Sequence, residues 1–239
     1  MEISNTLDKN HILVVVVVDF ERAEFVPLNN SDIVRIENIV KAPIGRKIVN
    51  VRYIVESEWR MPQISKGLHM PEDFVLFDLD DGSQYCAYWE AINGYHTLLF
   101  TPVDYFKLRS GSMNKRFEQS ASLDISKLES WSIYVGRKIE DISIGWGEDS
   151  FRFSMDTSLV VPSIYWIKMC FEGGLMIVIA TGHEIWLSSE SSYLIAIEVP
   201  GSEAIRYFEP SPEDVCIIFD QHIAEKFTHN YRTVTTYPA

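Results

Sequence analysis

The residue types that perform chemistry in enzymes are present in this sequence, but their spacing matches no known catalytic motif. The chain has no GxSxG elbow, no HExxH helix, no GxGxxG turn and no phosphate-binding GxxxxGK loop. Serine, histidine and aspartate are scattered along it, so the sequence neither supports nor excludes a triad assembled from distant residues. We therefore expect no catalytic residues, and an enzyme stays an alternative.

Three closely spaced aspartates are the first candidate metal ligands. Asp78, Asp80 and Asp81 precede Gly82, and hard cations such as Ca²⁺ bind clustered carboxylates. The twelfth position of a calcium loop supplies a bidentate carboxylate, but here it is Trp89. The sequence therefore favours the solvated end of a β-hairpin over a calcium site.

Two histidines near the C-terminus are the second candidate. His222 and His229, with Glu225 between them, would share one face of a helix, and with Asp220 they could bind zinc or nickel. Two histidines often share a helix face by chance, so we predict no metal ion and no cofactor.

Two segments have the composition of binding loops. Residues 145–149 read GWGED, in which the glycines would let a ligand approach and Trp146 would stack on it; a turn between two strands is the simpler interpretation. Residues 56–60 read ESEWR, and tryptophan and arginine are common at interface hot spots. An ordinary surface loop without a binding role is the alternative for residues 56–60.

The charge balance predicts the class of partner. The net charge is −13; residues 1–120 carry 13 basic and 17 acidic side chains and residues 121–239 carry 8 and 17, so the halves have net charges of −4 and −9. Such a field repels nucleic acids and anionic membrane surfaces, so we predict a basic protein partner. The predicted contact residues are charged or aromatic and lie in predicted loops and turns: Glu148, Asp149, Glu184, Glu190, Glu56, Glu58, Trp59 and Arg60.

A repeated motif indicates an internal duplication. Residues 44–48 (IGRKI) recur as 135–139 (VGRKI), and a turn glycine follows the first motif glycine after 37 residues in one copy and 38 in the other. These turn glycines, Gly82 and Gly174, end Asp-Gly and Gly-Gly pairs between apolar runs, which suits two-residue hairpins because both central positions take positive φ. We expect the two copies to superimpose over residues 31–106 and 122–208, ending on the matching segments LFTP (99–102) and YFEP (207–210).

Each copy is predicted to open with a short helix. Capping residues, Asp32 and Asp124, are followed by apolar side chains at intervals of three and four, and Pro43 ends the first helix. A further helix is predicted to begin at Ser211 and to continue through residues 215–227, with a strand at 215–219 as the alternative.

The second copy is longer after its hairpin. Gly82 and Phe100 are 18 residues apart, whereas Gly174 and Phe208 are 34 apart. We predict that residues 184–199 form an extra antiparallel hairpin across a turn at 188–192, that residues 200–201 turn again, and that the hairpin lengthens the second sheet.

Two features indicate the compartment. The apolar run at residues 12–18 is too short to span a membrane and no cleavage site follows it, so we interpret it as a buried strand. The three cysteines are far apart and flanked by apolar residues, which is typical of free thiols in a reducing compartment. Both features predict a cytoplasmic protein.

The sequence therefore predicts a mainly β protein (β-rich α+β) with two tandem repeats of a short helix plus an antiparallel meander, divided into residues 1–121 and 122–239. A glycine and a basic pair before a strand, followed by an acidic hairpin, resemble the pattern of small acidic β-rich bacterial proteins, some of which neutralise toxins. We expect a non-enzymatic protein that binds a basic partner, as an immunity-type inhibitor does. An enzyme or small-molecule binder with a cleft between the repeats and a structural or assembly subunit are the alternatives.

Overall fold

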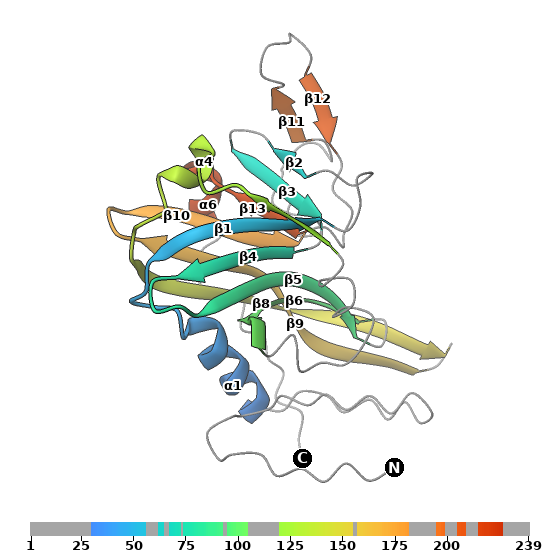
Figure 1. The fold of residues 1–239 in the computed structure, drawn as a ribbon. Helices are drawn as coiled ribbons and strands as arrows, with labels where there is room; N and C mark the ends of the chain where they lie inside the picture. Colours follow the sequence, from blue (N-terminus) through green and yellow to red (C-terminus); the bar gives the residue numbers. More distant parts are fainter. Residues whose placement is uncertain are drawn as a thin grey trace.

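The protein is mainly β, as predicted, and its strands form two large antiparallel sheets (Figure 1). The computed structural model describes residues 30–55, 62–64, 67–72, 74–92, 95–104, 120–154, 157–181, 195–198, 205–208 and 215–226. The five-stranded sheet has the order β6 (Tyr95–Pro102), β5 (Gln84–Ile92), β4 (Phe74–Leu79), β1 (Ile48–Val55) and β7 (Ala121–Asp124). The six-stranded sheet has the order β2 (Gln63–Ile64), β3 (Leu68–Glu72), β13 (Val215–Ile218), β10 (Leu175–Thr181), β9 (Thr157–Phe171) and β8 (Ile139–Ser154).

One hydrophobic core lies between the sheets and contains side chains from both halves of the chain. Its largest fully buried members include Phe77 and Phe100 from the first half and Trp131, Tyr134 and Phe171 from the second. These rings contact one another mostly edge to face, an arrangement that aromatic pairs prefer. The two halves therefore share the core that lies between the sheets.

The helix α1 (Asn30–Lys41) forms where the sequence predicts it. Asp32 lies in its first turn and Lys41 in its last, which complements the helix dipole, and Ile33 and Val40 are buried. The helix ends before Pro43, whose ring disfavours helical geometry at the preceding residue.

The second predicted helix is shorter than expected. Residues up to Asp124 belong to β7, and α4 (Glu129–Ser132) begins only at Glu129. The Asp124 carboxylate accepts the Ser126 backbone N–H (3.0 Å), which forms a turn, and β7 pairs with β1. The prediction of a helix starting at Asp124 is therefore wrong.

The two halves pair their strands in the same register. Ile48 of β1 lies opposite Leu79 of β4, and Ile139 of β8 lies opposite Phe171 of β9, which is a shift of 91 residues in one strand and 92 in the other. Both ladders skip one residue directly after this rung. The next strand pairs, β4–β5 and β9–β10, also match at the 92-residue shift. The two halves therefore share their strand register. That they arose by duplication of one unit stays a prediction.

The two glycines of the repeated motif join the halves by reciprocal hydrogen bonds. Gly45 N–H donates to the carbonyl of Ile139 (2.8 Å), and Gly136 N–H donates to the carbonyl of Ile48 (2.7 Å). Their φ angles are 89° and 85°, a region in which a side chain costs backbone strain. Lys47 and Lys138 form an antiparallel bridge between the same two turns.

The end of each repeat differs from the predicted alignment. The fourth strand of the second meander is β13, which pairs with β10 as β6 pairs with β5. LFTP (99–102) therefore corresponds to residues 216–219, at the end of β13, and not to 207–210. Residues 215–218 are thus a strand, the alternative interpretation, and the predicted helix is limited in the described residues to α6 (Gln221–Lys226).

The predicted extra hairpin is only partly described, since residues 182–194 lie outside the described residues. β11 (Ile195–Glu198) pairs with β12 (Ile205–Phe208), on either side of the predicted turn at 200–201, in a separate two-stranded sheet. The expectation that this segment lengthens the second sheet is therefore wrong for β11. No helix in the described part of the chain is long and apolar enough to cross a membrane.

Candidate functional site

Most of the predicted contact residues lie outside the described residues: Glu56, Glu58, Trp59, Arg60, Glu184 and Glu190. The two remaining residues, Glu148 and Asp149, lie in β8, opposite Pro162 and Val161 of β9. The prediction that they occupy a turn is wrong, because β8 continues without interruption to Ser154.

The GWGED segment is part of a strand and its glycines make room for aromatic rings. A Cβ atom on Gly145 would collide with the ring of Trp166, and one on Gly147 with the ring of Tyr165. Trp146 is buried, and its indole N–H donates to the Glu37 carboxylate of α1 (3.1 Å). The segment is therefore a strand, and both sequence interpretations, a turn between two strands and a ligand loop, are wrong about its backbone.

The three aspartates at the hairpin end of β4 have different partners, and Asp80 accepts the Lys47 backbone N–H (3.1 Å). Asp78 accepts hydrogen bonds from Asn50 (3.0 Å), Arg52 (2.7 Å) and Gln84 (2.6 Å) on the outer face of the five-stranded sheet. Asp81 lies at the hairpin end, where it pairs with an arginine and accepts two bonds from a serine. No group of metal-ligating side chains occurs among the described residues, and His229 is not one of them.

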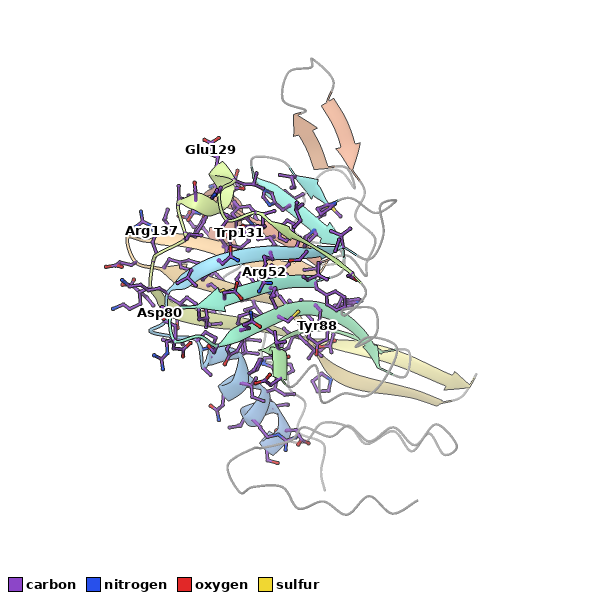
Figure 2. The ribbon with its side chains drawn as sticks, viewed as in Figure 1. Arg52, Asp80, Tyr88, Glu129, Trp131 and Arg137 are labelled. Carbon is purple, nitrogen blue, oxygen red and sulfur yellow. The ribbon has the colours of Figure 1, made fainter. Side chains whose placement is uncertain are left out.

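A buried polar chain joins the two sheets and α4. Trp131 projects from α4 into the protein (Figure 2), and its indole N–H donates to the Tyr53 hydroxyl (2.9 Å). That hydroxyl lies 2.6 Å from Nδ1 of His69 on β3, and Nε2 of His69 lies 2.9 Å from the Ser130 hydroxyl. His69 and Tyr53 are fully buried. A serine, a histidine and a third polar group in line is an arrangement that nucleophilic enzymes use, so its proton positions matter.

Both ring nitrogens of His69 lie beside a hydroxyl group, so neither is left open to a substrate. An indole nitrogen is only a donor, so the Tyr53 oxygen accepts the Trp131 N–H. The direction of the two bonds at His69 depends on which ring nitrogen carries the proton. These hydrogen bonds connect β1, β3 and α4. Sequence reasoning missed this polar chain because its members are far apart and form no motif.

The shifted pKa values have structural causes. Burial raises the pKa of the thiols of Cys86 and Cys170 and raises the pKa of the Tyr134 hydroxyl to about 12. Hydrogen bonds from serines lower the pKa of Asp81 and Asp124, which lie at exposed turns. A carboxylate with a lowered pKa stays ionised at neutral pH. It can stabilise its turn, but it is a poor general acid or base near neutral pH.

The most distinctive structural element is the outer part of the β8–β9 hairpin, residues 147–154 and 157–163, which we call the arm. β10 pairs with β9 only between Trp166 and Phe171, whereas the β8–β9 ladder continues past this region to Ser154 and Thr157. In Figure 1 the arm projects from the sandwich as a two-stranded ribbon. It carries Glu148 and Asp149, so the arm is the candidate binding element.

Comparison with protein-family models, curated proteins and solved structures finds no match to this chain. Any functional assignment therefore rests on the site itself.

Proposed function

We propose that this protein is a non-enzymatic binding protein that contacts a basic protein partner through the arm, in the manner of an immunity-type inhibitor. The observation that carries the proposal is the projecting two-stranded ribbon with its acidic pair, Glu148 and Asp149.

The packing between the halves supports binding over catalysis. An enzyme of the alternative type would place its substrate in a cleft between the repeats. The described residues at that position are buried aromatic and aliphatic side chains, including Trp131 and Phe219, whose ring centroids lie 4.9 Å apart. The buried histidine there has both ring nitrogens engaged in hydrogen bonds.

The charge of the chain supports a basic partner. A net charge of −13 raises the rate of encounter with a positively charged surface and disfavours acidic competitors.

The test compares two double charge reversals on the same strand. Affinity capture from the native host identifies the partner, which is then purified for association measurements by surface plasmon resonance. Glu148→Lys with Asp149→Lys should lower the association rate, and raising the salt should reduce the wild-type rate because the screening length at physiological salt is about 8 Å.

Glu140→Lys with Asp141→Lys is the matched control, because this exposed acidic pair lies on β8 in the body of the sandwich. It changes the net charge equally and should leave most of the association rate intact. Equal rates for both variants and the wild type, with the fold intact by circular dichroism, would refute the proposed role of the arm.

A further inference from the structure

The arm has two edges, and hydrogen-bond alternation indicates which of them can pair with a further strand. In an antiparallel pair, residues alternate between those that bond to the partner strand and those whose N–H and C=O point away from it. One rung is fixed by an observation: Ile164 N–H donates to the Thr97 hydroxyl of β6 (3.0 Å), so it points away from β8. Trp146, which lies opposite Ile164, therefore directs its backbone groups away from β9.

A second residue agrees with this assignment. Two rungs further along the arm, Glu148 lies opposite Pro162, and the alternation predicts that the backbone groups of Glu148 also point away from β9. Proline has no N–H and suits such a position. Continuing the alternation, the residues of β8 whose backbone faces the outer edge are Glu148, Ser150 and Arg152, and those of β9 are Pro162, Val160 and Ser158.

The two edges differ in their capacity to pair. On β9 the N–H of Ile164 is already used by Thr97 and Pro162 offers no donor, so two consecutive outward positions cannot donate to another strand. On β8 the outward positions from Glu148 to Arg152 each have an N–H and a C=O. Among the described strands β8 ends its sheet, and its bond to α1 comes from the Trp146 side chain, before the arm begins.

We propose that the partner adds an extended, basic strand to the β8 edge of the arm, along Glu148, Ser150 and Arg152. This rests on the proposed function, because it names how the same arm holds its partner. Edge strands offer rows of unpaired backbone groups that bind an added strand, and the side chains of that strand supply specificity. The acidic pair at residues 148–149 and the charge of −13 make a basic strand the complementary occupant.

The proposal is tested with prolines on opposite edges of one rung. Ser150→Pro removes an outward N–H from the β8 edge, and Val160→Pro removes the outward N–H directly opposite it on β9. The probe is a nine-residue peptide of alternating lysine and valine, measured by fluorescence polarisation alongside the purified partner. Ser150→Pro should weaken binding of both by about tenfold or more, and Val160→Pro by less than about threefold, because only the first change affects the paired edge.

Amide hydrogen exchange measured by NMR gives a readout that does not depend on the variants folding equally well. The amides of Glu148, Ser150 and Arg152 should exchange fast in the free protein and become protected when the peptide is bound. Protection already present in the free monomer would mean that another segment of this chain occupies the edge, and protection that rises with protein concentration would mean a second copy. Either result overturns the proposal.

The two proposals fail separately. If Glu148→Lys with Asp149→Lys slows association but Ser150→Pro and Val160→Pro weaken binding equally, the arm binds a basic partner without strand addition. If neither the charge reversal nor Ser150→Pro changes binding, both proposals are wrong.

Discussion

The two meanders, β1-β4-β5-β6 and β8-β9-β10-β13, share their strand order and register, and they differ in the path of the chain beyond their first strands. In the first meander the chain leaves the sheet after β1, and its connection supplies β2 and β3, which pair beside β13 in the other sheet. In the second, β8 and β9 continue past the sheet as the arm. The shared part positions the halves, and the part that differs carries the candidate site.

Their side chains also differ at corresponding positions. Val40 on α1 and Trp131 on α4 stand at the 91-residue shift and both are buried, but Trp131 contacts three aromatic rings and reaches Tyr53. On the outer faces, Asp78 holds a polar network where the second half has Cys170. The two meanders thus share strand order and register but make different side-chain contacts.

The largest expected effect tests the difference between Trp131 and Val40, which occupy corresponding positions in the core. Trp131→Ala should lower the free energy of unfolding by about 3–5 kcal/mol, because it removes a fully buried ring and leaves a cavity. Val40→Ala, at the corresponding position, should cost about 2 kcal/mol for the two lost methyl groups. Urea unfolding monitored by circular dichroism measures both, and equal costs would contradict the unequal roles assigned to α1 and α4.

An intermediate effect tests whether the turns at Gly45 and Gly136 contribute equally to stability. Gly45→Ala and Gly136→Ala should each cost about 1–2 kcal/mol, because both glycines have positive φ and open space around an added Cβ. Gly67→Ala is the control, since its Cβ would make ordinary contact, 3.6 Å from the Cβ of Asp220, without positive φ. Costs for Gly45 and Gly136 that differ clearly in the same unfolding assay would show that the two turns are not equivalent.

The smallest effect distinguishes the two hairpin ends, where Asp81 in the first half corresponds to Gly173 in the second. Hydrogen bonds from the Ser83 hydroxyl and backbone N–H hold the pKa of Asp81 below its ordinary value. Its stabilisation is therefore present above the ordinary carboxylate pKa and is lost as the pH falls through the lowered value. Asp81→Asn should remove this small contribution, because solvent screening weakens charge interactions at so exposed a site.

The measurement compares unfolding midpoints at about pH 7 and about pH 3, on either side of the ordinary carboxylate pKa. Asp81→Asn should lose slightly less stability on acidification than the wild type. Ser83→Ala keeps the carboxylate and removes one donor, so it should show part of the same change. Identical acid sensitivity in all three proteins would contradict the role given to this hairpin.

Local sequence patterns determined the elements whose geometry depends on adjacent residues. The glycines at positions 45, 82, 136 and 174 mark turns because their positive φ is disfavoured for other residues, and all four have it. The end of α1 before Pro43 follows from the proline ring, which disfavours helical geometry at the preceding residue, and Asp32 in the first turn complements the helix dipole. The mainly β class followed in the same way from apolar runs between these turns.

Tertiary structure decided what depends on residues far apart in the chain. Residues 215–218 fit a helix or a strand by local pattern, and they form a strand because β3 and β10 pair with them on both sides and bury all four side chains. Glycines usually mark turns, yet Gly145 and Gly147 lie within β8 because two rings from β9 pack against them. The backbone N–H of Ile164, at the base of the arm, donates to Thr97, which lies in a strand 67 positions away. No local pattern encodes such a contact, because its free energy appears only when both sheets are formed.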